Sequence, residues 1–202
     1  MNRIITIGRE FGSGGRTIAK MTGERLDISV YDSELLAKIA QESGLAEDYV
    51  ADRGEHASIS GLIAKGLSGF GGYQQTTAED YLWAIQRKVI LELAEKESCV
   101  LVGRCADYVL KDRPGVTHIF IYASEERRIA RIKFRADRIV SVYRDVSQDP
   151  PEKRLRDKDK RRSAFYSYHT DMTWGDPHNY HICLDSGALG FERCRDILCA
   201  LY

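Results

Sequence analysis

The fold of this chain is decided by residues 4–17, IITIGREFGSGGRT, in which an apolar strand runs into a glycine-rich loop. The apolar run 4–7 predicts a strand, and a helical pattern opens at Thr17 and continues to Leu26. Glycines allow successive backbone N–H groups to converge on one point, and the helix N-terminus adds partial positive charge. The segment therefore predicts a cradle for an anion, and a phosphate chain is the usual occupant of such a cradle.

The loop departs at two positions from the phosphate-loop pattern G-x-x-x-x-G-K-[ST], which requires glycine at position 10 and lysine at position 16. The chain has Glu10 and Arg16 there. The sequence Gly15-Arg16-Thr17 nevertheless keeps a cation and a hydroxyl where the pattern places them. The residues predicted to bind phosphates are Gly12, Ser13, Gly14, Gly15, Arg16 and Thr17. A plain glycine-rich turn is the alternative interpretation.

Strands and helices alternate along the chain. Strands are predicted at residues 4–7, 28–31, 99–102, 118–122 and 181–184. Helices are predicted at residues 17–26, 33–41, 77–96, 106–111, 124–138, 151–168 and 189–201. Strands that are apolar almost throughout are typical of a parallel sheet covered on both faces. The order predicts a single α/β domain over residues 1–202, with three layers (α/β/α) and a five-stranded, doubly wound parallel sheet.

Composition narrows the range of partners. The 30 Lys and Arg balance the 30 Asp and Glu, so no net field favours nucleic acid or an anionic membrane. The cysteines number five and form no C-x-x-C pair, which favours reduced thiols. Neither a signal-peptide pattern nor an apolar run of membrane-spanning length occurs in the sequence. We therefore expect a cytoplasmic protein with small-molecule partners, and the sequence leaves its oligomeric state open.

Two insertions interrupt the alternation. One, at about 33–80, is longer than a single crossover helix requires, and its glycine-rich stretch 66–72 predicts a mobile loop. The other, at about 135–165, is basic, because residues 127–162 carry 14 Lys and Arg against 6 Asp and Glu. Ligands of doubly wound sheets bind beyond the carboxyl ends of the strands. Both insertions are therefore predicted lids, which exclude water during phosphoryl transfer.

Phosphoryl transfer needs cations on the transferring oxygens, a metal held by a hydroxyl and a carboxylate, and a positioned acceptor. Arg16 is the candidate cation for the terminal phosphates. Thr17 is a candidate Mg²⁺ ligand through its hydroxyl, and Asp32, just after the second strand, is the candidate carboxylate. An N-cap of the following helix explains Asp32 equally well from its position, and the two roles are compatible.

Two further strand ends carry candidate side chains. Arg104 follows the third strand and Gly103, and it is either a phosphate clamp or a surface arginine at the start of a helix. Asp107 either locks the Arg104 guanidinium or favours the helix N-terminus. Asp185 ends the fifth strand, where N-capping explains it and a contact with base or sugar is a secondary interpretation.

The basic insertion contains RLRDKDKRR at residues 154–162. On a helix, Arg154, Lys158, Arg161 and Arg162 fall on one side, so several cations could address one phosphate cluster. The ordinary alternative is a solvated helix face with charge pairs one turn apart.

These pieces together resemble the cytidylate kinase-like family of nucleoside monophosphate kinase relatives. The resemblance covers nearly the whole chain, and it is carried by GREFGSGGRTIA (8–19), VYDSELL (30–36), CVLVGRCADYVL (99–110) and WGDPHNYHICLDS (174–186). Arginine in place of the usual lysine, as at position 16, resembles the phosphate loop of this family. The resemblance implies a P-loop kinase fold in which the first insertion binds the acceptor.

The resemblance also implies roles for single residues. Gly103-Arg104 is similar to the pair that grips the acceptor phosphate, and Asp32-Ser33 to a pair associated with metal and nucleotide. The run Arg156 to Arg161 is similar to a lid whose cations stabilise the transferred phosphoryl group. Leu184-Asp185-Ser186 resembles the segment near the acceptor cytidine. The candidate catalytic residues are then Arg16, Arg104, Arg156, Lys158, Arg161 and Arg162.

The activity that the resemblance implies is transfer of a phosphoryl group from ATP, with Mg²⁺, to CMP or a similar acceptor. Glu10 and Arg16 depart from the general loop pattern, and residues 53–76 show no acceptor-binding pattern. A kinase for another small molecule, such as a sugar or a cofactor precursor, is the near alternative. A nucleotide-binding module without turnover and a purely structural domain are the others.

Overall fold

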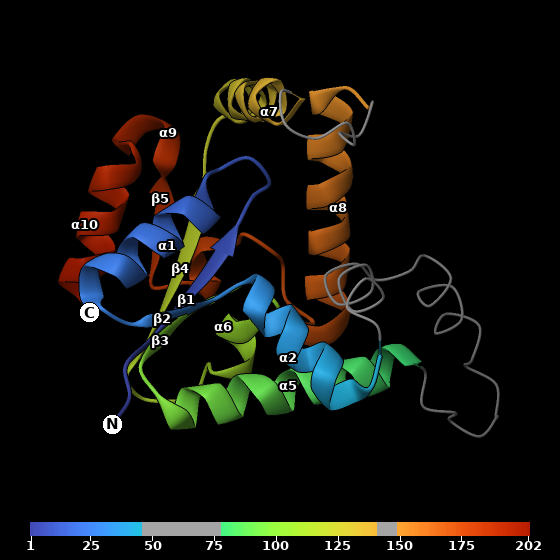
Figure 1. The fold of residues 1–202 in the computed structure, drawn as a ribbon, viewed down its shortest axis with the longest axis vertical. Helices are drawn as coiled ribbons and strands as arrows, with labels where there is room; N and C mark the ends of the chain where they lie inside the picture. Colours follow the sequence, from blue (N-terminus) through green and yellow to red (C-terminus); the bar gives the residue numbers. More distant parts are fainter. Residues whose placement is uncertain (46–77, 141–148) are drawn as a thin grey trace.

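The computed structural model describes residues 1–45, 78–140 and 149–202 (Figure 1). Its strands are β1 Ile4–Arg9, β2 Ser29–Tyr31, β3 Cys99–Val102, β4 Val116–Tyr122 and β5 Ile182–Asp185. Its helices are α1 Gly15–Leu26, α2 Ser33–Ser43, α5 Ala78–Lys96, α6 Ala106–Val109, α7 Glu125–Val140, α8 Pro151–Thr170, the 3₁₀ turn η1 Pro177–Asn179, α9 Ser186–Leu189 and α10 Phe191–Leu201.

The strands form one five-stranded sheet in the order β2-β3-β1-β4-β5. Every pair of neighbours is parallel, and Ile4 of β1 is in register with Cys99 of β3 and Val116 of β4. The prediction of a five-stranded parallel sheet is confirmed. Because β1 is central and later strands are added on both of its sides, the loop after β1 lies at a topological switch point, where such sheets bind ligands.

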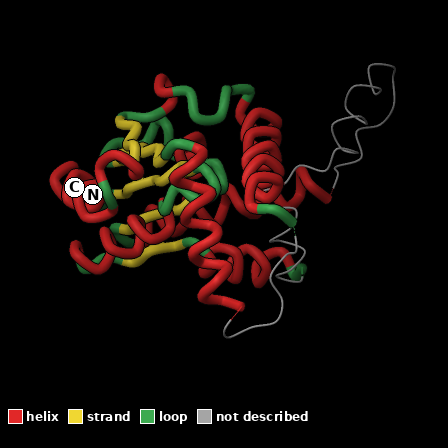
Figure 2. The backbone as a smooth tube through the Cα atoms, turned by 90° about the horizontal axis from the view of Figure 1, so that it is seen from above, coloured by secondary structure: helices red, strands yellow, loops and turns green. Residues whose placement is uncertain are grey.

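Helices lie on both faces of the sheet (Figure 2). Two apolar cores fill the space between the helices and the sheet, because alternate strand residues point to opposite sides. Ile5 and Ile7 of β1 pack with the buried side chains of α1 and α10. Ile4 packs on the other face with α2, α5 and α6. Each core joins β1 to helices from distant parts of the sequence. The α/β/α layering predicted from the strand pattern is therefore confirmed.

Helix α8 stands beside the sheet and runs from α7 toward α5 (Figure 1). Near α7, Lys133 lies 3.4 Å from Glu152. At the other end, the ring of His169 stacks on Trp83 of α5 with 4.3 Å between ring centroids. Helix α8, which contains the C-terminal part of the predicted basic lid, thus contacts α7 at one end and α5 at the other.

Some predicted element boundaries differ from the structure. The helix expected at 189–201 begins at Phe191 as α10, because Gly190 has a φ of +78° that interrupts the helix, and a short helix that was not expected, α9, precedes it. Helix α1 begins at Gly15 rather than Thr17. The glycine-rich stretch 66–72, most of the first insertion and residues 141–148 of the second lie outside the described residues.

No helix in the described ranges is long and apolar enough to cross a bilayer. The cysteines, all within the described residues, are free thiols, as expected from their number and spacing.

Candidate active site

The phosphate loop has the backbone that its glycines predict. Gly12 and Gly14 have φ values of +79° and +86°, which L-residues with a Cβ rarely adopt. A Cβ on Gly14 would lie 2.4 Å from the ring of Phe191, and one on Gly15 would lie 2.7 Å from Cβ of Arg9. Helix α1 begins at Gly15, so its first N–H groups have no carbonyl within the helix to bond. Loop and helix together present N–H groups and the positive end of a helix dipole.

The carbonyl groups of the loop are held by residues from α7 and from the start of α9. Arg131 of α7 donates from Nη1 to the carbonyl oxygens of Ser13 (2.8 Å) and Gly12 (3.3 Å), and from Nη2 to the carbonyl oxygen of Ser186 (2.9 Å). Ser186 Oγ donates to the same Ser13 carbonyl at 2.5 Å. These hydrogen bonds fix the carbonyl groups of Gly12 and Ser13 and so hold the orientation of the peptide groups in the loop.

Arg16 and Asp32 meet beside the start of α1. Arg16 Nε lies 2.7 Å from Asp32 Oδ2, and Arg9 Nη2 lies 3.7 Å from Asp32 Oδ1. Asp32 stands at the N-cap position of α2, yet its side chain makes no capping hydrogen bond. The carboxylate is directed to the arginines instead. Its neighbour Ser33 is the first residue of α2.

A cavity of about 770 Å³ opens along α1 and the outer edge of β2, and Arg16, Thr17 and Asp32 line one end of it. The Thr17 hydroxyl and the Asp32 carboxylate are oxygen donors, which are the ligands that Mg²⁺ takes together with substrate phosphates and water. The donor set therefore fits this ion. A preformed cluster of three or more His, Cys, Asp or Glu side chains is absent from the described residues.

Arg104 lies on a tight backbone turn at the end of β3. Gly103, Arg104 and Cys105 have φ values of +76°, +60° and +53°, so two non-glycine residues adopt the left-handed conformation. The Gly103 N–H donates to the carbonyl of Ile7 of β1 (3.0 Å), and buried Gln86 of α5 donates to the Arg104 carbonyl (3.0 Å). These bonds hold a strained turn next to the phosphate loop, and such strain is concentrated at functional sites.

Asp107, three residues after Arg104, is buried and accepts a hydrogen bond from Tyr166 Oη of α8 at 2.7 Å. Burial raises the pKa of Asp107 to about 6, and the hydrogen bond from Tyr166 works in the opposite direction. Asp107 also lies in the first turn of α6, where a negative charge is favoured. This carboxylate therefore joins the helix that follows Arg104 to helix α8.

The cations of α8 differ in their surroundings. Arg162 is largely buried and donates from Nη1 to the carbonyl of Arg9 at the end of β1 (3.1 Å). Arg156 is 74% exposed and lies 3.5 Å from Glu125 of α7. Lys158 is half-buried and Arg161 is exposed. Arg162 thus already contacts the loop, whereas a shared action of all four cations stays a prediction.

Asp185 is the N-cap of α9, where its side chain accepts hydrogen bonds from the N–H groups of Gly187 (2.8 Å) and Ala188 (3.1 Å). N-capping, the first of the two explanations that the sequence allows, accounts for this residue in the structure.

Comparison with known proteins shows which family this chain belongs to. A sequence profile of the Cytidylate kinase-like family matches residues 4–188. The chain belongs to the cytidylate kinase-like family. A cytidylate kinase of Archaeoglobus fulgidus is 26% identical to it over 198 residues, which are 96% of this chain and 91% of that protein.

Solved structures agree with this family's fold. An uncharacterized protein of Eubacterium ventriosum superposes with a TM-score of 0.71 at 26% identity, covering 99% of this chain and 98% of that one. A shikimate kinase of Bacteroides thetaiotaomicron superposes with a TM-score of 0.54 at 14% identity, covering 98% of this chain and 97% of the other. The second similarity shows the fold alone, which is that of the P-loop kinases.

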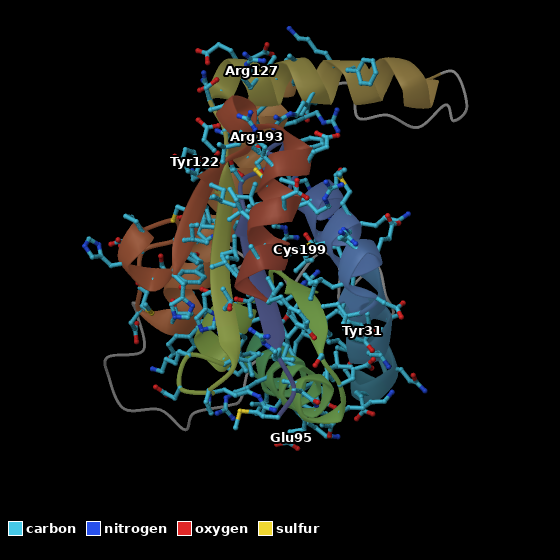
Figure 3. All side chains as sticks on the ribbon, turned by 90° about the vertical axis from the view of Figure 1, so that its left-hand side faces the viewer. Tyr31, Glu95, Tyr122, Arg127, Arg193 and Cys199 are labelled. Carbon is cyan, nitrogen blue, oxygen red and sulfur yellow. The ribbon has the colours of Figure 1, made fainter. Side chains whose placement is uncertain are left out.

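In this member of the cytidylate kinase-like family, sequence reasoning missed several residues that contact the loop or Asp32. They are Arg9, Arg128, Arg131 and Asp159. Figure 3 labels Arg127 at the start of α7, the helix from which Arg128 and Arg131 come, and it also labels Tyr122, the last residue of β4. The arginine spacing in EERRIAR (125–131) is the one signal in the sequence, because it places Arg128 and Arg131 on one helix face.

Proposed function

We propose that this chain transfers the γ-phosphoryl group of ATP to a nucleoside monophosphate such as CMP. The observation that carries the proposal is the adjacency of the phosphate loop after β1 and the buried Arg104 after β3. These strands are neighbours in the sheet, and their carboxyl ends face the same edge. The matching family profile and the Archaeoglobus fulgidus cytidylate kinase support the same chemistry.

The loop and its helix bind the donor in this proposal. The N–H groups of residues 14–17 receive the β- and γ-phosphate oxygens, and Arg16 places its guanidinium on the terminal phosphates. Arg104 binds the acceptor phosphate, because a fork of N–H donors matches phosphate oxygens. Arg162, together with the other cations of α8, stabilises the charge on the phosphoryl group in transit. Thr17 and Asp32 would hold Mg²⁺, which neutralises charge on the β- and γ-phosphates.

The reaction is a displacement at the γ-phosphorus. An oxygen of the acceptor phosphate forms the new bond, the bond to the β–γ bridging oxygen breaks, and ADP leaves. A phosphate acceptor is already ionised near neutral pH, so no side chain has to remove a proton. The protein supplies position and charge stabilisation.

The test is turnover by the purified chain with ATP and Mg²⁺, measured as ADP release through a coupled assay. The panel contains each common nucleoside monophosphate and, because shikimate kinases share the fold, hydroxyl acceptors such as shikimate. CMP is expected to give the highest kcat/KM. ADP release that no monophosphate raises above the acceptor-free rate would refute the proposal, and a preference for a hydroxyl acceptor would assign the chain to another small-molecule kinase activity.

A further inference from the structure

The first glycine of the general phosphate-loop pattern is replaced here by Glu10, and the structure shows what its side chain contacts. Glu10 Oε2 accepts a hydrogen bond from the Ala123 N–H at the end of β4 (3.1 Å) and lies 3.3 Å from Arg128 Nε of α7. Burial raises the pKa of Glu10, whereas the Arg128 charge lowers it. The carboxylate is thus directed at β4 and α7.

Arg128 contacts the loop and α8 as well as Glu10. Its side chain is only 9% exposed, and its Nη1 donates to the Phe11 carbonyl (3.3 Å) and to Asp159 Oδ2 of α8 (2.5 Å). A Cβ on Gly12 would lie 3.1 Å from Cβ of Arg128, so the loop backbone packs directly on this residue. One guanidinium therefore forms an ion pair with a loop side chain and hydrogen bonds with a loop carbonyl and with α8.

Asp159 completes the set from α8. Its Oδ1 accepts a hydrogen bond from the Phe11 N–H at 2.7 Å, so the two polar groups of the Phe11 backbone are bonded to α7 and α8 respectively. Arg162 of α8, 3.9 Å from Asp159, donates to the carbonyl of Arg9. The segment 9–11 is consequently held by α7 and by α8, and α8 carries the candidate catalytic cations.

We propose that Glu10, Arg128 and Asp159 are positioning residues that fix α7 and α8 on the phosphate loop. They thereby keep the candidate catalytic cations of α8 aligned with the N–H groups of the loop. This inference rests on the proposed function. Glu10 stands where the general pattern has glycine because its carboxylate forms the ion pair with Arg128, which glycine could not form. A helix displaced by about 1 Å carries its cations away from the transferring oxygens, which can reduce the rate about 100-fold.

The decisive variant is Glu10→Gly, which restores the residue of the general pattern. It is expected to lower kcat about 10- to 100-fold with little change in the KM for ATP, and Arg128→Ala is expected to do the same. Because both remove the same contact, Glu10→Gly/Arg128→Ala is expected to be no slower than the slower single variant. Wild-type kcat in Glu10→Gly, or a double variant that loses the product of the two single losses, would overturn the inference.

Two further variants separate positioning from folding. Arg128→Lys keeps a buried cation but lacks the fork that spans several partners, so an intermediate kcat is expected at an unchanged melting temperature, and wild-type kcat would contradict the role of the fork. Lys133→Ala is the matched control. It removes an exposed α7–α8 ion pair, with Glu152, that does not touch the loop, so kcat is expected to remain that of the wild type.

Hydrogen exchange on the ligand-free chain tests the inference without turnover. Asp159→Asn and Arg128→Ala are expected to speed amide exchange in the peptide 8–17, and Lys133→Ala is not. Equal exchange in Asp159→Asn and the wild type would overturn the positioning role even if the enzyme is active. Faster exchange in Asp159→Asn with no ADP release from the wild-type chain would instead refute only the proposed function.

Discussion

Arg16 and Asp32 are joined by an ion pair of 2.7 Å between Nε and Oδ2, and Arg16 is nevertheless 56% exposed. An exposed pair of this kind stabilises a fold by only about 0.2–1 kcal/mol, so the arginine has little effect on folding. What the ion pair does is to position the Arg16 guanidinium beside the start of α1. The pair holds that cation at the entrance of the loop before any nucleotide binds.

Arg16→Ala is therefore expected to lower kcat about 100-fold while changing the free energy of unfolding by less than about 1 kcal/mol. Coupled ADP assays and chemical denaturation measure the two quantities. Lys20→Ala is the control, because Lys20 lines the same cavity, is 77% exposed and pairs with Glu24. Turnover of Arg16→Ala within a few fold of the wild type would remove this residue from the site.

Gly14→Ala is expected to abolish tight ATP binding and to destabilise the fold by about 1–3 kcal/mol. The new methyl would lie 2.4 Å from the Phe191 ring, and the φ of +86° would also strain any residue with a Cβ. Isothermal titration with ATP and thermal denaturation give the two readouts. Gly14→Ala should cost less stability in a Phe191→Ala background than in the wild type, because the ring is gone. A Gly14→Ala protein with unchanged ATP affinity would contradict the required loop conformation.

The sequence predicted the fold because its strongest patterns are local. The segment 4–17 carries strand, glycines and helix start in continuous order, and β3 (Cys99–Val102) is buried throughout, as its apolar residues predict. The position of Arg104 at a strand end follows from the same pattern. Helix α9 was missed because one glycine, Gly190, ends it after a single turn.

The contacts that hold the loop could not be predicted from the sequence. Arg131 is 118 residues from Ser13, and Asp159 is 148 residues from Phe11, so no local period connects them. Arg128 and Arg156 both lie in basic helices, yet one is 9% and the other 74% exposed. Only the packing of α7 against the loop decides which arginine is buried. The roles of these residues in catalysis stay predictions.

Arg104→Gly and Arg104→Ala separate backbone strain from side-chain function. Both remove the guanidinium, so both are expected to lower kcat/KM for the acceptor by about 100-fold or more. Arg104→Gly is expected to be about 1 kcal/mol more stable than Arg104→Ala, because glycine adopts the φ of +60° without strain. Equal stability of the two variants in urea denaturation would show that the turn relaxes, and equal activity to the wild type would refute the acceptor role.

The raised pKa of the Asp107 carboxyl predicts that the stability of the fold depends on pH. Its pKa in the folded protein is raised by burial from 3.8 to about 6, so between these values the folded state holds a proton that the unfolded state has released. The stabilisation from the neutral carboxyl is complete below about pH 4, decreases as pH rises, and is lost above about pH 6. The expected loss is about 3 kcal/mol across this window.

The measurement is urea denaturation of the wild type and Asp107→Asn at intervals from pH 4 to 8. The neutral amide cannot ionise, so the stability of Asp107→Asn relative to the wild type is expected to increase with pH through this window and then to level off. Tyr166→Phe is the matched variant, because it removes the hydrogen bond that lowers the pKa of Asp107. The carboxyl should then stay neutral to higher pH, and the decline in stability should extend beyond pH 6. Parallel pH profiles for all three proteins would show that Asp107 titrates alike in the folded and unfolded chain, in contradiction to its burial.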